Sequence, residues 1–201
     1  MRVKICGITT IEAAQAAVRD GADFIGFVFA PSKRQLTPEQ AGDISAALPS
    51  TMQKVGVFVN ASYDTIIQTA EQAGLDIIQL HGDESPSFAE ELPYPIIKAF
   101  RMGKHDTAAI KAYPCDYYLV DSPKGPNRGG NGTTFDWTQL ANSDLDPQKT
   151  ILAGGLTPEN VQTAIATSRP AGVDVSSGVE TNGTKDLEKI NQFINNAKRK
   201  G

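Results

Sequence analysis

Cysteine and histidine are scarce in this chain, whose 201 residues include two of each. The two cysteines, Cys6 and Cys115, are too few for a disulfide framework and too far apart for the CxxC spacing of a zinc site. The two histidines, His81 and His105, lack the matching cluster of carboxylates that a metal centre of the His/Asp kind needs. We therefore expect free thiols and no metal site.

Basic clusters and long apolar runs are missing as well. Lys and Arg number 19 against 23 Asp and Glu, which gives a net charge of −4, and the largest basic cluster is the stretch 198–200. This composition predicts no nucleic-acid surface. A membrane span would need about 20 largely apolar residues in a row, and Met1 and Arg2 lead straight into a predicted strand rather than into a signal peptide. We expect a soluble, cytoplasmic protein.

What the chain does contain is a regular alternation of apolar runs and helical patterns. The runs are rich in Val, Ile and Phe, as strands buried on both faces should be. They cover residues 3–8, 23–29, 54–60, 76–82, 95–100, 117–121, 150–155 and 172–178. Eight strand–helix units without a linker predict a single-domain (β/α)8 TIM barrel over residues 1–201. A doubly wound open sheet is the alternative, but eight units in so short a chain favour a closed barrel.

Capping signals mark where the helices between these strands should begin and end. Thr9 and Glu12 have the spacing of a capping box, and Gly21 is placed to end the same helix. The stretches LTPEQ (36–40) and LTPEN (156–160) each predict a Thr N-cap followed by Pro at the first helical position. The last helix should bury apolar residues between 187 and 194.

Polar and small residues follow the carboxyl ends of the predicted strands, and in a barrel they would all ring one mouth. They are Cys6, Arg34, Asn60, His81, Arg101, Asp121, Gly154, Gly155, Ser176, Ser177 and Gly178. The glycines and serines come after strands 7 and 8, where TIM barrels often bind phosphate through backbone N–H groups. The two longest strand-to-strand spacings also add residues on this face. A phosphorylated ligand is therefore expected at the mouth.

Asp121 and Cys6 are the candidates for acid–base chemistry. Asp121 precedes a glycine-rich stretch, 122–137, that could cover a ligand and help Asp121 to hold a proton, although an acid here could also simply cap the loop. Cys6 ends its strand at the mouth, whereas Cys115 precedes its strand and suits a core role. A catalytic Cys6 would need its pKa lowered, by helix dipoles or by Arg34. His81 could line the site or only pack, and His105 is expected to be a solvated loop residue.

Six motifs in this order resemble the phosphoribosylanthranilate isomerase family, over nearly the whole chain. They are KICGIT, GFVFAPSKR, QLHG, DSPKGPNRGGNGTTFDW, LAGGLTPENV and GVDVSSGVE. The segment ETNGTKD (180–186) departs from the family pattern because it lacks a proline often found there, and the loop after Asp121 is slightly long. These departures bear on the phosphate contacts and on loop closure.

The resemblance implies an Amadori rearrangement in tryptophan biosynthesis, from N-(5′-phosphoribosyl)anthranilate to 1-(2-carboxyphenylamino)-1-deoxyribulose 5-phosphate. It implies that Asp121 is the acid that opens the sugar ring and that Cys6 is the base at sugar carbon 2. Arg34 would then bind the anthranilate carboxylate. No metal or organic cofactor is implied, and members of the family occur as monomers and homodimers.

Other phosphosugar barrels are the competing interpretations. A pentose-phosphate epimerase would need more metal ligands than this chain offers. An indole-forming synthase would need lysines at strand ends, where Lys4 and Lys98 are the candidates. A non-catalytic phosphosugar-binding barrel would keep the glycines and serines but would not need both Cys6 and Asp121.

Overall fold

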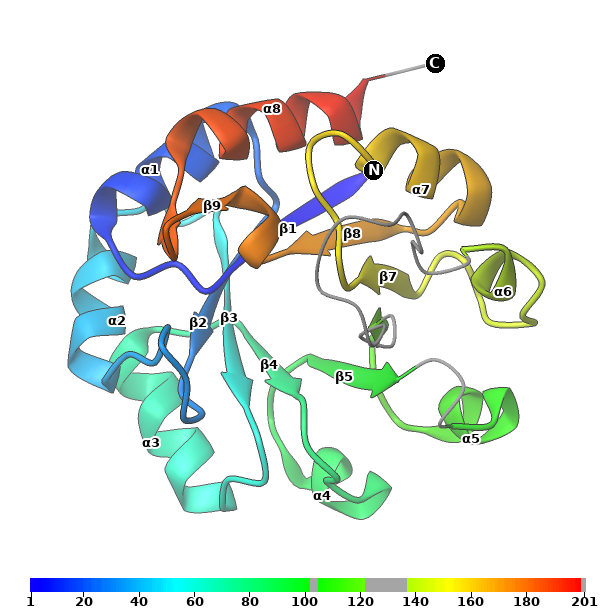
Figure 1. Cartoon of the computed structure of the whole chain (residues 1–201). Coiled ribbons are helices and arrows are strands. Elements are labelled where there is room, and N and C mark those ends of the chain that lie inside the picture. The colour runs from blue at the N-terminus through cyan, green and yellow to red at the C-terminus, as the bar shows by residue number, and fades with distance from the viewer. Residues whose placement is uncertain (102–104, 122–136, 200–201) are drawn as a thin grey trace.

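The computed structural model describes residues 1–101, 105–121 and 137–199, and within them eight parallel strands close into a barrel (Figure 1). The strands pair in chain order, and β1 closes the barrel by pairing with β8. They are β1 (Arg2–Cys6), β2 (Phe24–Val28), β3 (Gln53–Phe58), β4 (Ile77–Leu80), β5 (Ile96–Arg101), β6 (Tyr117–Asp121), β7 (Thr150–Ala153) and β8 (Gly172–Val175). The predicted TIM barrel is confirmed, and the alternative of an open sheet is wrong.

One helix follows each strand, and the helices surround the barrel in chain order (Figure 1). They are α1 (Ile11–Asp20), α2 (Pro38–Ala46), α3 (Tyr63–Ala73), α4 (Pro86–Glu91), α5 (Thr107–Ala112), α6 (Thr138–Ala141), α7 (Val161–Ser168) and α8 (Leu187–Lys198). Between β8 and α8 the chain adds a short 3-10 helix, η1 (Ser177–Val179), and a two-stranded hairpin of β9 (Glu180–Thr181) and β10 (Thr184–Lys185). No described helix is long and apolar enough to cross a membrane.

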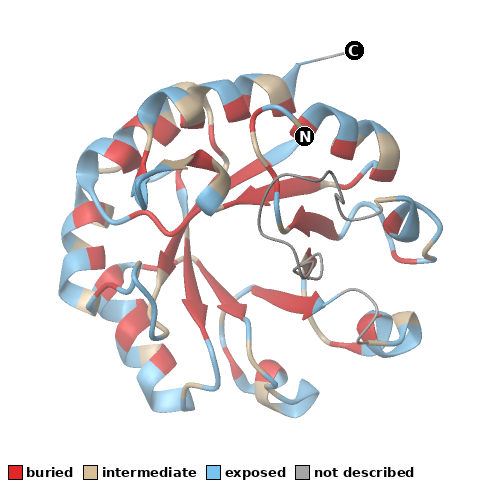
Figure 2. Cartoon of the chain, viewed as in Figure 1, coloured by how far each residue is buried: buried red, intermediate tan, exposed pale blue. Residues whose placement is uncertain are grey.

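The core has two layers, because successive side chains of a strand point to opposite faces. Phe24, Val55, Ile97, Leu119 and Ile151 pack together inside the barrel. The outward-facing residues of the strands pack against the helices in a second, larger cluster. Figure 2 shows the result, with strands buried almost along their whole length and helices buried only on their inner faces. This burial explains why the strands are apolar in nearly every position.

Two of the four predicted capping signals are confirmed. Thr37 caps α2 in a complete capping box, and Gly21 ends α1 with a left-handed φ of 95°. The first helix, however, is capped by Thr10 rather than Thr9, because the Thr10 side chain accepts a hydrogen bond from the backbone N–H of Ala13.

The Thr-Pro signal at residues 157–158 is also wrong as a helix start. Asn160 accepts a hydrogen bond from the backbone N–H of Thr157, at 2.8 Å, and closes a separate turn there. Helix α7 therefore begins only at Val161.

Candidate active site

Strand alternation directs the predicted acid and His81 toward the mouth of the barrel. Leu119 packs in the barrel interior, so Asp121, two residues further along β6, faces inward as well. Ile77 of β4 also packs inside the barrel. His81 comes directly after the strand, four residues further along, so it points to the same inward side. Cys6, the last residue of β1, is buried in the barrel wall.

A cavity of about 250 Å³ opens at this mouth, near the ends of β4, β5 and β6. His81, Arg101 and Asp121 are among the residues that line it. The predicted acid and a predicted binding residue therefore share one space. Cys6 and the loops after β7 and β8 are not among the lining residues, so the structure does not bring every predicted group into this one cavity.

His105 lines the same cavity, and it is a loop residue, as predicted, that is only partly exposed to solvent. Its side chain is half-buried, and its ring packs edge-on against Phe100 with the ring centroids 5.5 Å apart. The apolar ring of Phe100 gives the imidazole a surface to pack on, and this contact covers part of the ring.

Burial and nearby charge favour the neutral form of His81, which also contacts a neighbour on the same inward face. The amide nitrogen of Gln79 lies 2.9 Å from Nδ1 of His81. With the Gln79 amide in this orientation, Nδ1 accepts and the ring proton sits on Nε2. Burial, together with the positive charge of Lys4, lowers the pKa of His81 below its usual value. The ring therefore offers a donor rather than a positive charge.

Arg34 is bound in a fork by a residue that the sequence analysis did not single out. Its Nε donates to Oε1 of Glu180 at 2.5 Å, and its Nη2 donates to Oε2 at 2.8 Å. Lys185 donates to the same Oε1, also at 2.8 Å, and to the backbone carbonyl of Ser176. Burial alone would raise the pKa of Glu180, but hydrogen bonds from Arg34 and Lys185 lower it to about 2. Glu180 is therefore ionised and fixes the direction of the guanidinium.

The hairpin that carries Glu180 and Lys185 has a recognisable cause in the sequence. Asn182 and Gly183 both have left-handed backbone angles, with φ of 52° and 83°. Two consecutive residues with positive φ make the turn type that Asn-Gly favours in tight β-hairpins. The dipeptide was therefore the signal that could have predicted this hairpin, which joins the loop after β8 to the loop after β2.

The surroundings of Cys6 differ from the prediction. Gly7 has a left-handed φ of 74°, and the side chain of Arg34 lies across it so closely that a Cβ would collide. Burial raises the pKa of the Cys6 thiol, although the positive charge of Lys4 opposes the shift. The net shift is thus opposite to the one that a catalytic Cys6 would need, and the cation with the largest effect on the thiol is Lys4 rather than Arg34.

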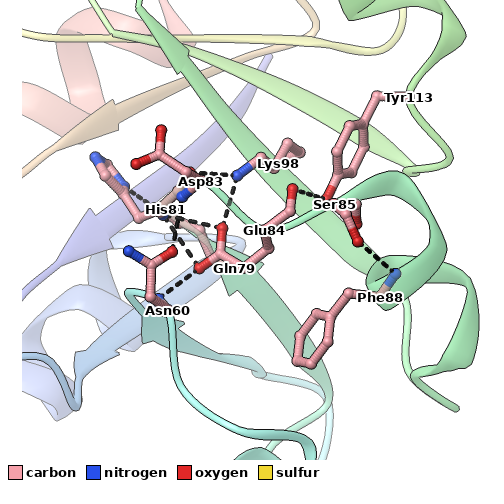
Figure 3. Close-up of polar contacts among 10 residues, drawn as sticks. Asn60, Gln79, His81, Asp83, Glu84, Ser85, Phe88, Lys98 and Tyr113 are labelled. Atoms are coloured by element: carbon pink, nitrogen blue, oxygen red, sulfur yellow. Dashed lines mark hydrogen bonds and ion pairs between the residues drawn. The ribbon is translucent and has the colours of Figure 1, made fainter.

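The loop after β4 is braced by a buried ion pair on the outer side of the barrel wall (Figure 3). Nζ of Lys98 lies 2.7 Å from Oε2 of Glu84 and donates to the backbone carbonyl of Gly82 at 2.6 Å. The other oxygen of Glu84 accepts from the backbone N–H of Asn60 at 2.8 Å, and the side chain of Asn60 in turn accepts from the N–H of Asp83. This network holds the segment that follows His81.

We predict that Lys98→Met lowers the free energy of unfolding by about 3–5 kcal/mol, because it leaves the buried carboxylate of Glu84 without its partner charge. Denaturant unfolding measures the loss. Lys111→Met is the matched control, since Lys111 forms an ion pair of similar length with Asp144 at the surface, where side chains are 47% and 66% exposed. Equal losses in the two variants would contradict a bracing role for the buried pair.

The glycines after β7 and β8 have backbone angles or close contacts that a side chain would not tolerate. Gly154 and Gly155 both have left-handed φ angles, of 85° and 65°. A Cβ on Gly178 would collide with the backbone carbonyl of Leu156, so the loops after β7 and β8 touch backbone to backbone at this point. At Gly155, by contrast, no described atom lies within 4 Å of the position that a Cβ would take. Close loop packing and open space beside Gly155 suit the approach of an anion.

The predicted covering stretch, 122–136, lies outside the described residues. Among the residues that the structure does describe, no group of three or more His, Cys, Asp or Glu side chains is arranged to hold a metal ion.

A closed (β/α)8 barrel with a carboxyl group, an imidazole and a thiol at the carboxyl ends of its strands is the architecture of a TIM-barrel enzyme. The family model described as N-(5'phosphoribosyl)anthranilate (PRA) isomerase matches residues 3–196. The chain therefore belongs to the phosphoribosylanthranilate isomerase family, whose members are intramolecular isomerases of tryptophan biosynthesis.

Individual relatives agree over the full length of the chain. It is 54% identical to N-(5'-phosphoribosyl)anthranilate isomerase of Oceanobacillus iheyensis, over 100% of this chain and 98% of the relative. The crystal structure of the Thermotoga maritima isomerase matches with a TM-score of 0.87 and 43% identity, over 98% of both chains. A crystal structure of such an isomerase in complex with reduced 1-(o-carboxyphenylamino)-1-deoxyribulose 5-phosphate matches with a TM-score of 0.86 and 40% identity, again over 98% of both chains.

Proposed function

We propose that this chain converts N-(5′-phosphoribosyl)anthranilate to 1-(2-carboxyphenylamino)-1-deoxyribulose 5-phosphate, with Asp121 as general acid and Cys6 as general base. The observation that carries the proposal is the placement of the two groups. Asp121 ends β6 and Cys6 ends β1, at the two sides of β7 and β8, whose loops contain the glycines suited to a phosphate. A ribose whose phosphate is bound by those loops would lie between acid and base.

The two groups act in successive steps. The Asp121 carboxyl donates its proton to the ring oxygen of the ribose as the bond from that oxygen to carbon 1 breaks, and the nitrogen lone pair forms an iminium. The Cys6 thiolate then removes the proton from carbon 2. The electrons of that C–H bond form the C1–C2 double bond, the iminium electrons return to nitrogen, and the enolamine tautomerises to the ketone. Asp121 ends as a carboxylate and Cys6 as a thiol, so each regains its starting state by proton exchange.

The remaining site residues bind the two ends of the substrate. Arg34 uses Nε and one N–H of Nη2 on Glu180, which leaves the outer edge of the guanidinium, Nη1 with the second N–H of Nη2, for the anthranilate carboxylate. The backbone N–H groups of Gly155, Ser177 and Gly178 would bind the phosphate. Ser176 and Gly154 shape the loops on either side, and His81 would donate through Nε2.

The direct test follows the anthranilate fluorescence of freshly generated N-(5′-phosphoribosyl)anthranilate. We expect the purified wild-type protein to make this fluorescence decay far faster than the spontaneous rate. If the folded protein left the decay unchanged, the proposed reaction would be wrong.

Arg34→Met should raise KM for the substrate by about 10–100-fold, because it removes charge-assisted hydrogen bonds to the anthranilate carboxylate. Steady-state kinetics measure the change. Lys33→Met is the matched control: Lys33 also faces Glu180, at 3.7 Å, but its side chain is 61% exposed. Inhibition by ribulose 5-phosphate, which has no anthranilate group, should be almost unaffected by Arg34→Met. If Arg34→Met weakened the binding of both ligands equally, Arg34 would not be the residue that binds the anthranilate carboxylate.

A synthase that works through catalytic lysines is disfavoured by the partners of both candidate lysines. Lys98 points out of the barrel interior into its ion pair with Glu84. Lys4 is fully buried in an ion pair with Asp174. Both amines are therefore already engaged by buried carboxylates.

We further propose that this enzyme takes a small phosphosugar as its only partner besides its own copies, and that it works in the cytoplasm. Its assembly as a monomer or as a homodimer stays a prediction. A related isomerase from Thermotoga maritima, 39% identical over 98% of this chain, is described as a dimeric protein from which monomers were generated.

A further inference from the structure

A buried ion pair inside the barrel has no part in the proposed acid–base mechanism. Nζ of Lys4 in β1 lies 2.9 Å from Oδ1 of Asp174 in β8, and the two residues are paired in the strand register. The Lys4 side chain is 0% exposed and that of Asp174 is 11% exposed. Replacing such a pair by apolar residues usually leaves stability unchanged or improves it. Stability alone therefore gives a weak reason for placing these charges inside the barrel.

The position of the pair suggests another reason, because it lies directly beneath Cys6. Lys4 and Cys6 are two residues apart on β1 and thus share the inward face of that strand. Both reach the space in front of Gly26 on β2, where a Cβ would lie 2.9 Å from the Cys6 sulfur and 3.1 Å from the Lys4 ammonium nitrogen. The missing side chain of Gly26 is what lets the sulfur and the ammonium group share this space.

Other charged groups surround Cys6, but they are engaged elsewhere. Arg34 and Lys185 face it from the loops after β2 and β8, and both are bound to Glu180. His81, on the other side of the mouth, responds to the charges of both Lys4 and Asp174. Lys4 is the cation with the largest electrostatic effect on the thiol, and the Asp174 carboxylate acts in the opposite direction.

We propose that Lys4 and Asp174 are positioning residues for Cys6: the Lys4 ammonium stabilises the thiolate, and Asp174 holds that ammonium in place while it limits its effect. This inference rests on the proposed role of Cys6 as the base. The Lys4 ammonium then provides a fixed positive charge beside Cys6 when the reaction requires the thiolate. Burial by itself would lower the pKa of Lys4, but the charges of Asp174 and Cys6 raise it above its usual value, so the ammonium remains charged.

The test is the pH dependence of Cys6 alkylation by iodoacetamide in a Cys115→Ser background, where Cys6 is the only thiol of the chain. Lys4→Met should move the midpoint to higher pH by at least about one unit, which makes alkylation about tenfold slower at a pH below both midpoints. Asp174→Asn keeps a hydrogen-bond acceptor for Lys4 but removes the negative charge, so the midpoint should move to lower pH. The rising limb of kcat/KM against pH should shift in the same two directions.

Glu84→Gln is the matched control, since it also removes a carboxylate from a buried Lys–carboxylate pair, but on the outer side of the barrel wall. It should leave the alkylation midpoint of Cys6 unchanged. If Lys4→Met fails to fold, as circular dichroism would show, Asp174→Asn alone decides the question. A purely structural pair would give shifts of one sign or none in the two variants, and that result would overturn the inference. Full turnover in Cys6→Ala would instead refute the proposed base, whatever the alkylation midpoints are.

Discussion

Asp121→Asn is expected to lower kcat by a factor of about 10²–10⁴, the usual contribution of a positioned general acid. The amide has nearly the same shape as the carboxylic acid but cannot release a proton to the ring oxygen. Substrate should still bind, because the phosphate and anthranilate contacts come from other elements. The decay of anthranilate fluorescence measures kcat, and the substrate dependence of the rate gives KM.

The same strand supplies a control for this variant. Asp116 immediately precedes β6 at the end opposite to the mouth, where its carboxylate accepts a hydrogen bond from the backbone N–H of Ile96. Asp116→Asn should therefore affect stability rather than kcat. If Asp121→Asn kept more than about a tenth of the wild-type kcat, Asp121 would not be the general acid.

The fold could be predicted from the sequence because the strands are buried on both faces, and this burial gives a repeated pattern of apolar runs. Strands with core on both faces must be apolar at almost every position, and eight such runs separated by helix patterns fit few architectures. Strand ends were less certain by one to a few residues, since the polar residues at 81 and 176 continue the inward alternation after hydrogen bonding in the strand has ended. The cap at Thr10 was missed because two threonines stand side by side.

Ion pairs between elements were the part of the site that the sequence did not reveal. Glu180 and Arg34 are 146 residues apart, and the residues around each one do not indicate that the other is its partner. Lys4 and Asp174 did leave a signal, because each is a charged residue in the middle of an apolar strand. Such a residue must find a partner of opposite charge inside the barrel. The direction of the Cys6 pKa shift could not be predicted for the same reason, because it depends on burial and on the charge of Lys4.

Cys6→Ala should abolish turnover to a similar extent, about 10²–10⁴ in kcat, because no thiolate remains to remove the proton from carbon 2. Cys115→Ser is the matched control: Cys115 precedes β6 at the opposite end of the barrel, and burial there raises the pKa of its thiol to about 12. This second variant should keep the wild-type kcat. Activity in Cys6→Ala above about a tenth of wild type would remove Cys6 from the mechanism.

The pH dependence of the wild-type enzyme adds a second, independent check on Cys6. Because burial raises the pKa of this thiol, the thiolate fraction continues to increase at pH values above the ordinary thiol pKa of about 8.5. The limb of kcat/KM that reports the base should therefore rise through this range, and it should be missing from the residual activity of Cys6→Ala. A base limb with the same midpoint in both proteins would mean that another group removes the proton. Since Lys4 opposes the effect of burial, a comparison of the wild-type limb with that of Lys4→Met also measures how far the ammonium beneath Cys6 offsets the cost of forming a buried thiolate.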